Sequence, residues 1–430
     1  MRTRVSPPEA GTPSPWHPGR RPRPRAQQSP GWPESAGLRE IRERLGARPP
    51  LVTPAEVAGL RRRLAGVASG RGVVIQMGDC AETFALPTPV DSARTVALAR
   101  TAASLVEERL GVRVVSIGRI AGQFSKPRTS LTEEVDGVQV PSFRGDLVNA
   151  SAPDELSRRP EPRRLLWGYE HAARTLSLLR RAGADGGPGT GSGAGPVSVP
   201  AHALASGPVL WTSHEALILD YEEPLTRWDA EGGAWVLCST HFPWVGERTR
   251  HVDGAHVRFL AEVANAVGCK VGPGMTPEEI VRLAEILDPD CRPGRLVLIA
   301  RMGEGRVGAV LPGLVEAVRE AGHPVSWLCD PMHGNTVRAS SGHKTRHMSA
   351  VLAEITGFVA AVRSGGGRPG GLHLESTAES VTECVGGRSG ILESQVPDAY
   401  YTACDPRLNS DQALEAVAYF ADALVNSSGV

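Results

Sequence analysis

Short apolar runs that are typical of buried strands alternate along this chain with segments of helical periodicity. Continuous runs of this kind indicate parallel strands covered on both faces, and regular strand–helix alternation indicates a parallel sheet. The runs occupy residues 72–80, 112–119, 209–215, 234–241, 269–273, 296–301, 325–333 and 371–375. Eight strand–helix units predict an α/β fold of the (β/α)8, or TIM, barrel type. A doubly wound open sheet is the alternative, but no GxGxxG motif follows the first run.

The remaining segments are expected to extend this barrel. Residues 1–35 are rich in Pro, Arg and Ser, which predicts an irregular or disordered N-terminal arm. Residues 36–430 are predicted to form a single catalytic barrel domain with extra loop and helical segments, including a Gly/Ser-rich loop at about 183–200. Residues 252–267 have helical spacing. A ninth apolar run, at 399–405, is interpreted as a loop after the last strand.

Two patterns resemble capping boxes at helix starts. Both have Thr followed by Pro at the first helical position and Glu at the third, at residues 53–56 and 276–279. We therefore predict that helices begin at Pro54 and Pro277.

The composition restricts the classes of partner. The chain has 47 basic and 47 acidic residues, so it has no global field that would attract nucleic acid, and we expect no nucleic-acid partner. It has no apolar stretch near the ~18 residues of a transmembrane helix and no apolar signal-peptide core, so we expect no membrane association. Seven scattered cysteines without a CxxC pair indicate reduced thiols in a cytoplasmic protein. We expect small-molecule ligands and a homo-oligomer, either a dimer or a tetramer.

Nearly every predicted strand ends at a side chain that can do chemistry. These side chains are Cys80, Arg119, Glu215, His241, Lys270, Arg301, His333 and Glu375. A single His after a strand is more often a structural residue than a ligand. In a barrel, however, the carboxyl ends of all strands meet at one face, where the active site lies. One shared site therefore explains the set better than eight separate structural roles.

Four of the candidate residues carry metal-ligand atoms. Cys80 offers sulfur, His333 nitrogen, and Glu375 and Asp405 oxygen. This mixture suits one divalent ion of intermediate softness, such as Mn²⁺, Co²⁺, Fe²⁺ or Zn²⁺, and it does not suit Mg²⁺ or Ca²⁺. The four residues lie far apart in the sequence, so their spacing gives no direct support.

The other candidates are mainly cationic. They are Arg119, Lys126, Arg128, Arg248, Arg250, Lys270 and Arg301. Such convergence in a neutral chain indicates a polyanionic ligand bound by Arg forks and Lys point charges. Salt bridges to acidic neighbours are the alternative, which we favour for Arg250 and leave open for Arg128. Only three of the 47 basic residues are lysine, and the third, Lys344, receives no role.

Nine short motifs follow one another along the chain, and their order matches that of a known enzyme family. They are GDCAE (78–82), GRIAGQFSKPR (118–128), WTSHEALILDYE (211–222), WVGERTR (244–250), GCKVGP (268–273), IARMG (299–303), CDPMHGNT (329–336), HLESTAESVTECVGG (373–387) and CDPRLN (404–409). Over roughly residues 30–425 the chain resembles the class II (plant-type) 3-deoxy-D-arabino-heptulosonate 7-phosphate (DAHP) synthases. The resemblance implies a TIM barrel that condenses phosphoenolpyruvate with erythrose 4-phosphate and releases phosphate, in the first step of the shikimate pathway.

The resemblance also implies a role for each matching residue. Cys80, His333, Glu375 and Asp405 would be the metal ligands. The phosphoenolpyruvate site would consist of Arg119, Glu247, Arg248, Lys270 and Arg301. The phosphate of erythrose 4-phosphate would lie near Lys126, Arg128 and Thr129. Lys270 and Glu247 would be the catalytic candidates for handling the water that adds to phosphoenolpyruvate.

Two alternatives remain beside this interpretation. One is an amino-DAHP synthase of an antibiotic pathway that uses an imino-erythrose 4-phosphate, which no residue here distinguishes. The other is a barrel that binds a metabolite without turnover, which the intact motifs disfavour. The segment between Lys126 and Trp211 is short, as in family members associated with secondary metabolism.

Overall fold

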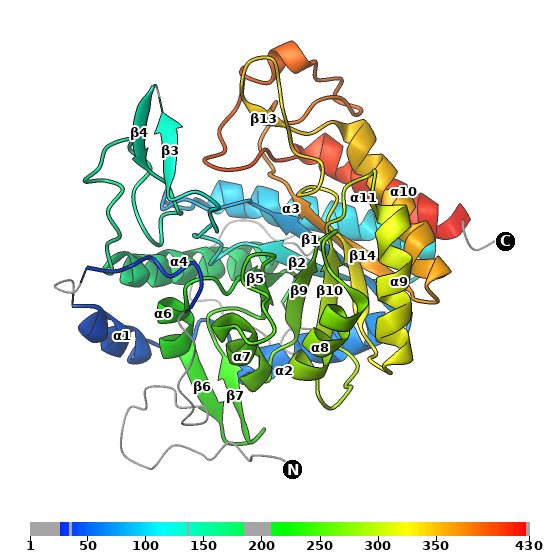
Figure 1. The fold of residues 1–430 in the computed structure, drawn as a ribbon, viewed down its shortest axis with the longest axis horizontal. Helices are drawn as coiled ribbons and strands as arrows, with labels where there is room; N and C mark the ends of the chain where they lie inside the picture. Colours follow the sequence, from blue (N-terminus) through cyan, green and yellow to red (C-terminus); the bar gives the residue numbers. More distant parts are fainter. Residues whose placement is uncertain (1–25, 34–36, 136, 185–207, 427–430) are drawn as a thin grey trace.

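The fold is a closed barrel of parallel strands surrounded by helices (Figure 1). The computed structural model describes residues 26–33, 37–135, 137–184 and 208–426. Around the barrel the strands follow the order β1, β14, β11, β10, β9, β8, β5 and β2, and all neighbouring pairs are parallel. Their bounds are β1 (Gly72–Gly78), β2 (Arg113–Arg119), β5 (Trp211–Glu215), β8 (Phe242–Val245), β9 (Val267–Val271), β10 (Leu296–Ala300), β11 (Ser326–Cys329) and β14 (Pro369–Glu375). The predicted (β/α)8 barrel is confirmed.

One predicted barrel strand is wrong. Residues 234–241 contain β7 (Ala234–Leu237), which pairs with β6 (Thr226–Asp229) in a separate antiparallel hairpin. The barrel strand is the following run, β8. The side chain of Asn265 accepts from the backbone N–H of Leu237 at 2.9 Å and donates to its C=O at 3.0 Å. Because a side chain satisfies these groups, the chain turns there, and the apolar run is divided between two sheets.

His241 is consequently not at a carboxyl end. It precedes β8, and its Nδ1 accepts a hydrogen bond from the backbone N–H of Thr212 at 3.0 Å. Burial lowers the pKa of His241 to about 4, so the side chain is neutral. The prediction that places it beside the other strand-end residues is wrong, and its role is structural.

Helices cover the outside of the barrel. They are α1 (Leu38–Gly46), α2 (Pro54–Ala68), α3 (Pro89–Leu110), α4 (Arg164–Ala184), α6 (Leu219–Glu222), α7 (Ala255–Glu262), α8 (Pro277–Leu287), α9 (Val307–Glu320), α10 (Met348–Ser364) and α11 (Ser410–Asn426). The capping box at Thr53 is confirmed, and Thr276 caps α8 by accepting from the N–H of Glu279. The helix expected over 252–267 is shorter, because the backbone is already extended at Val263, where it pairs with Trp235.

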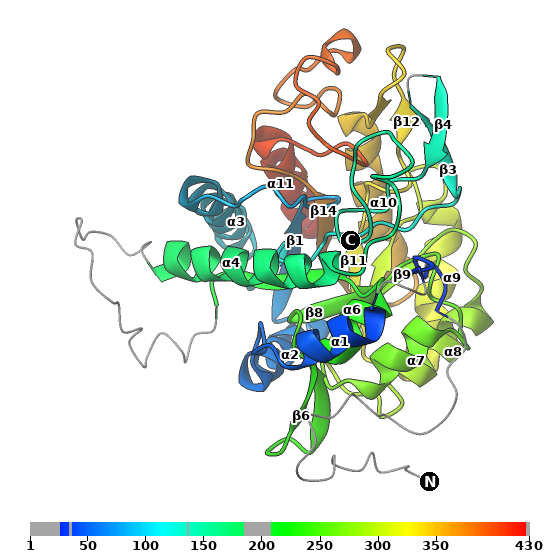
Figure 2. The same ribbon diagram turned by 90° about the vertical axis from the view of Figure 1, so that its left-hand side faces the viewer.

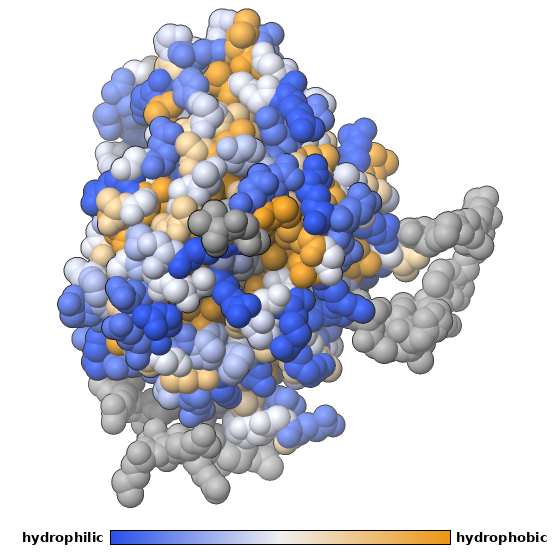
Figure 3. All heavy atoms as spheres, turned by 90° about the vertical axis from the view of Figure 1, so that its right-hand side faces the viewer, coloured by the Kyte–Doolittle hydropathy of each residue, from blue (hydrophilic) through white to orange (hydrophobic). Residues whose placement is uncertain are grey.

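The barrel interior is filled at its amino end. Inward side chains such as Val74, Phe242 and Trp244 share a buried cluster with Leu60 and Leu64 of α2. This helix lies at the lower end of the barrel in Figures 1 and 2. The outward strand residues pack against the surrounding helices in a larger cluster. On the side of α9 to α11 the surface is mainly hydrophilic, with smaller apolar patches between the charged side chains (Figure 3).

Additional hairpins mark the two ends of the barrel. The hairpin of β3 (Thr132–Val135) and β4 (Val138–Pro141) follows β2, and that of β12 (Val337–Arg338) and β13 (Lys344–Thr345) follows β11. Both lie at the upper end in the two ribbon views, opposite the β6–β7 hairpin (Figure 2). Residues 399–405 form a loop, as predicted.

Two sequence predictions concern residues that lie mostly outside the described chain. They are the arm at 1–35, of which residues 26–33 are described and irregular, and the loop at about 183–200, of which only 183 and 184 are described. Within the described residues, no helix combines the length and the apolar character needed to cross a membrane.

Candidate active site

A cavity of about 570 Å³ opens at the carboxyl ends of the barrel strands. Residues from six strand ends line it, namely Cys80, Arg119, Glu215, Lys270, Arg301 and His333. The loops after the strands add Lys126, Arg128, Thr129, Glu247, Arg248, Lys344 and Asp405. The structure therefore brings the predicted site residues into one place, with Glu375 in contact with those that line the wall.

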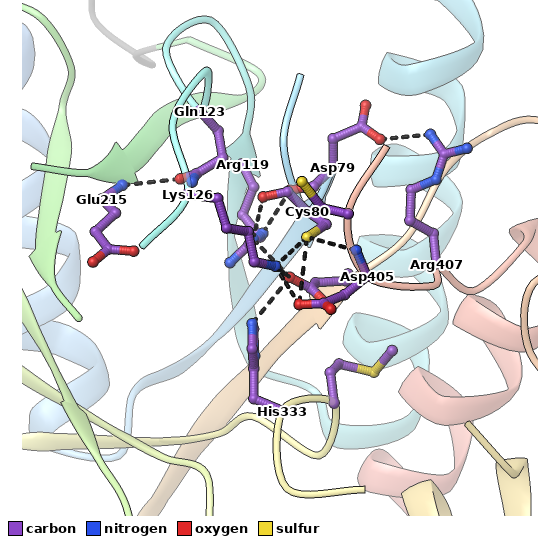
Figure 4. Close-up of polar contacts among 12 residues, drawn as sticks. Asp79, Cys80, Arg119, Gln123, Lys126, Glu215, His333, Asp405 and Arg407 are labelled. Carbon is purple, nitrogen blue, oxygen red and sulfur yellow. Dashed lines mark hydrogen bonds and ion pairs between the residues drawn. The ribbon is translucent and has the colours of Figure 1, made fainter. Parts of the chain in front are cut away.

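The four predicted metal ligands lie together, and three of them, Cys80, His333 and Asp405, are labelled in Figure 4. Ligand atoms of Cys80, Glu375 and Asp405 all lie within 4.8 Å of one another. The sulfur of Cys80 is 3.9 Å from Oδ2 of Asp405. Nε2 of His333 is 3.1 Å from Oε1 of Glu375, so the fourth ligand adjoins the other three. Sulfur, nitrogen and carboxylate oxygen from four separate segments thus face one point, which is the ligand set of a divalent transition metal.

Lys126 shows that this cluster accommodates a compact cation. Its ammonium contacts the sulfur of Cys80 and Oδ2 of Asp405, and it lies 3.7 Å from Oε1 of Glu375. Burial alone would raise the pKa of Asp405, but the neighbouring charges of Lys126, Arg346 and Lys344 keep it well below its usual range. The donor set fits a divalent metal ion in both ligand type and charge.

Arginines fix the carboxylate of Glu375. Nη2 of Arg346 is 2.7 Å from Oε2, and Nη2 of Arg119 is 3.1 Å from Oε1. Glu375 and Arg346 are both fully buried. Burial would raise the pKa of Glu375, but nearby cationic groups, among them Lys126 and Arg346, hold it well below the usual value. The carboxylate therefore remains ionised, with Oε1 directed toward His333.

Asp330 joins the metal ligands to the cationic part of the cavity. Its Oδ2 accepts from Nδ1 of His333 at 2.7 Å and also contacts the ammonium of Lys270. A carboxylate at Nδ1 orients the imidazole of His333 so that Nε2 is directed at the predicted ligand cluster. Although burial alone would raise its pKa, the interactions with His333 and Lys270 hold the pKa of Asp330 well below its usual range. Sequence reasoning missed this residue, although it stands three positions before His333.

Two cations of the cavity lie over one aromatic ring. The guanidinium carbon of Arg119 is 5.2 Å from the ring centroid of Trp244, and Nζ of Lys270 is 6.0 Å from it. Burial lowers the pKa of Lys270 to about 8, even though Asp330 opposes this shift. Nη2 of Arg301 donates to the backbone C=O of His333 at 3.0 Å. The cavity thus holds a compact group of fixed positive charges.

Arg119 is held in place by a buried chain of hydrogen bonds. Ser213 donates to the C=O of Gly118, and Gln76 donates to Ser213 at 2.9 Å. The amide oxygen of Gln76 therefore faces Nδ1 of His373 at 2.7 Å, which must donate. The other nitrogen of His373 accepts from Nη1 of Arg119. The chain sets the histidine tautomer and directs the guanidinium.

The remaining predicted site residues form ion pairs or hydrogen bonds with neighbouring side chains. The carboxylate of Glu247 contacts Arg250 at 2.7 Å, and Arg250 also contacts Glu279, which agrees with the structural role favoured for Arg250. Arg248 donates to the hydroxyl of Thr129 at 2.9 Å and so connects the two predicted substrate regions. Nη2 of Arg128 lies 3.5 Å from Glu133.

Two further residues, to which the sequence analysis assigns no role, lie in the cavity. Glu215 lies in the cavity wall, its Oε1 is buried without a hydrogen-bond partner, and burial raises its pKa. Lys344 contacts Oδ1 of Asp405 at 2.8 Å. All three lysines of the chain therefore line one cavity. The scarcity of lysine was a signal that could have placed Lys344 in the site.

A family model decides the relationship of this chain to known proteins. The class-II DAHP synthetase family model matches residues 16–190 and 198–421. The chain belongs to the class II DAHP synthetase family. This membership carries the DAHP synthase activity, in which phosphoenolpyruvate and erythrose 4-phosphate condense at the start of the shikimate pathway. The family is metal-dependent, in agreement with the buried Cys, Glu and Asp cluster.

Similar proteins agree with this membership. A probable phospho-2-dehydro-3-deoxyheptonate aldolase of Pseudomonas fluorescens is 43% identical over 392 residues, which cover 91% of this chain and 94% of the relative. The phospho-2-dehydro-3-deoxyheptonate aldolase AroG of Mycolicibacterium smegmatis is 38% identical over 433 residues, with 93% and 92% covered. A solved structure of phospho-2-dehydro-3-deoxyheptonate aldolase from Francisella tularensis is similar with a TM-score of 0.52 and 14% identity, covering 90% of this chain and 96% of that one. At that identity it supports the fold alone.

The position of Asp330 generates a first prediction. Asp330→Asn keeps the side-chain volume but replaces one acceptor oxygen by a donor, so the remaining oxygen cannot accept both from His333 and Lys270 and from the backbone N–H groups of Met332 and His333. We expect the affinity for Mn²⁺ or Co²⁺ to fall by about 10- to 100-fold, the usual effect of removing a partner that orients a ligand histidine. Competition with a chromogenic chelator measures this. Asp253→Asn, at a carboxylate with 92% side-chain exposure, is the matched control. Equal metal affinity of the Asp330→Asn variant and the control would contradict the assignment.

Proposed function

We propose that this cavity performs the DAHP synthase reaction with a metal ion held on one wall and phosphoenolpyruvate held on the other. The observation that carries the proposal is the juxtaposition of a buried Cys, His, Glu and Asp cluster with a group of fixed cations. The two parts share Asp330, which contacts a residue of each.

Cys80, His333, Glu375 and Asp405 would hold one divalent ion. Mn²⁺ or Co²⁺ is proposed, with Zn²⁺ or Fe²⁺ as alternatives, because sulfur beside oxygen and nitrogen suits ions of intermediate softness. When bound, such an ion supplies a Lewis acid for the aldehyde oxygen of erythrose 4-phosphate. The chain's own contribution is to orient the four ligand atoms through Arg119, Arg346 and Asp330.

Arg119, Arg248, Lys270 and Arg301 would bind phosphoenolpyruvate. The carboxylate and phosphate of this substrate carry several negative charges, which the cations offset. Arg119 and Lys270 are already held by hydrogen bonds and ion pairs, so their side chains need not reorder when the substrate binds. A fixed position also orients the methylene carbon for attack on the aldehyde. Lys126, Arg128 and Thr129, which line the same cavity as Lys270, would bind the phosphate of erythrose 4-phosphate.

Carboxyl groups near Lys270 would manage the proton of the water that adds to phosphoenolpyruvate. Glu247 and Lys270 are the sequence-based candidates, and one buried oxygen of Glu247 has no hydrogen-bond partner. Glu215 is a further candidate, since burial raises its pKa and a raised pKa suits a carboxyl that exchanges a proton near neutrality. The ammonium of Lys270 would stabilise negative charge as phosphate leaves.

We also propose the cellular compartment and the oligomeric state of the enzyme. All seven cysteines are free, which supports a reducing, cytoplasmic compartment. We retain the proposal of a homo-oligomer, a dimer or a tetramer, which light scattering on the purified protein tests.

Metal removal tests the ligand cluster. We expect exhaustive chelation to abolish phosphate release from phosphoenolpyruvate and erythrose 4-phosphate, and Mn²⁺ or Co²⁺ to restore it better than Mg²⁺ or Ca²⁺, because the thiolate and imidazole disfavour hard ions. Full activity of a sample shown by elemental analysis to be metal-free would refute the proposal.

Alanine variants of Lys270 and Lys126 are expected to lose interactions with different substrates. Losing one charge-assisted contact to a bound anion costs about 2–5 kcal/mol, or roughly 30- to several-thousand-fold in kcat/KM. Lys270→Ala should lose phosphoenolpyruvate binding itself, as measured by calorimetry without the second substrate. Lys126→Ala should chiefly weaken the use of erythrose 4-phosphate. Wild-type phosphoenolpyruvate binding by both variants would show that the substrate map is wrong.

The lowered pKa of Lys270 predicts a pH dependence of binding. Below about pH 8 the ammonium is charged and attracts the substrate, and above this pH the neutral amine does not. The affinity for phosphoenolpyruvate should therefore be present at neutral pH and be lost as the pH rises through about 8. Calorimetric titrations across this range measure the effect, and an affinity that stays constant well above pH 8 would contradict it.

A further inference from the structure

Residues 26–33 lie against the loop that carries Arg128, although about 100 positions separate them in sequence. The side-chain amide of Gln28 donates to the backbone C=O of Arg128 at 3.1 Å, and the backbone N–H of Arg128 donates to the amide oxygen of Gln28 at 3.0 Å. One amide thus satisfies both backbone groups of Arg128. The loop at 123–128 has no regular secondary structure. Backbone groups at 123, 124 and 126 form hydrogen bonds with Glu82, Leu147 and Arg144, and Pro127 has no N–H to donate, so the amide of Gln28 holds the part of the loop that follows.

Arg144 provides a second link between this segment and the loop. Its guanidinium donates to the backbone C=O of Ser29 at 3.2 Å and to that of Gln28. Its own backbone C=O accepts from the N–H of Lys126 at 2.9 Å. The backbone of Lys126 and that of Arg128 are therefore both tied, directly or through one residue, to Gln28.

The segment is anchored at its other end. Nε1 of Trp32 donates to Oδ2 of Asp220 at 2.8 Å, the ring packs against a buried cluster that includes Phe124, and Pro30 is buried. Phe124 itself belongs to the loop that leads to Lys126. Burial of Pro30 and Trp32 offsets the conformational entropy lost by ordering the segment.

The backbone of Gln28 is in an uncommon conformation. Its φ is +59°, in the left-handed region that residues other than glycine seldom occupy. Such conformations persist where surrounding contacts determine them, and they are frequent at functional sites. The contacts of Gln28 with Arg128 and Arg144 are the ones that hold it.

We propose that Gln28 is a positioning residue for erythrose 4-phosphate, because it fixes the backbone of the phosphate-binding loop at Lys126 to Thr129 before the substrate arrives. This inference rests on the proposed function, which assigns that loop to the second phosphate. A loop that is already ordered does not lose conformational entropy on binding, so the substrate binds more tightly. In the proposed map phosphoenolpyruvate binds Arg119, Lys270 and Arg301, and also Arg248, which contacts this loop at the hydroxyl of Thr129 and not at the backbone that Gln28 holds. Its binding is therefore not expected to depend on Gln28.

The amide is specifically required. Gln28→Glu retains an acceptor for the N–H of Arg128 but sets the second carboxylate oxygen against the C=O of Arg128, so it should fail as Gln28→Ala does. Each change removes one or two neutral hydrogen bonds, which predicts a rise of about 3- to 30-fold in the KM for erythrose 4-phosphate. The affinity for phosphoenolpyruvate should not change.

Gln27 offers a matched control, since it is the neighbouring residue, has the same side chain and is exposed. Steady-state kinetics with each substrate varied in turn, and calorimetry with phosphoenolpyruvate alone, should be measured for the full-length wild type, Gln27→Ala, Gln28→Ala and Gln28→Glu. We expect only the two Gln28 variants to show the raised KM for erythrose 4-phosphate.

The results that overturn the inference are distinct. An unchanged KM for erythrose 4-phosphate in Gln28→Ala, or an equal loss with both substrates, would contradict a positioning role. A wild type that does not condense the two substrates would instead overturn the proposed function, and the inference with it.

Discussion

The site depends on keeping carboxylates ionised where no water reaches them. Glu375 and Asp330 are fully buried, and an unpaired buried charge is strongly unfavourable. Each is therefore surrounded by cations or by histidine, with Arg119 and Arg346 at Glu375 and Lys270 at Asp330. Removing one partner of such a pair typically costs about 3–5 kcal/mol, because the other charge remains buried. The convergence of charged residues at this end of the barrel follows from this requirement.

The same buried ion pairs also provide the groups that would bind the metal ion and the substrates. The acids that neutralise the cations also offer metal-ligand atoms, and the cations that neutralise the acids also face the cavity where phosphorylated substrates would bind. A chain without net charge can thus carry a strongly cationic site, because the compensation is local. The closed barrel allows this local compensation, since its parallel strands bring distant sequence segments to one face.

Much of this was predictable from sequence, for an identifiable reason. Buried parallel strands are continuous apolar runs, so the positions of Cys80, Lys270 and His333 at their ends could be read directly. The apolar run before His241 gave a wrong prediction, because a hairpin strand and a barrel strand follow each other there. Hydrogen bonds from the side chain of Asn265 and to the backbone of Cys238 divide the two strands. The contacts of Asp330 with Lys270 and of Gln28 with Arg128 join segments that are far apart in the chain, for which the sequence has no periodic signal.

The central claim is that Cys80, His333, Glu375 and Asp405 bind one divalent ion. The most direct measurement is anomalous diffraction at the manganese or cobalt absorption edge from crystals grown with that metal. We predict a single strong peak at coordination distance from one atom of each of the four residues, within a few tenths of an ångström of the roughly 2.0–2.3 Å found for zinc ligands. A peak that lies elsewhere in the cavity, or that lacks one of these four ligands, would contradict it.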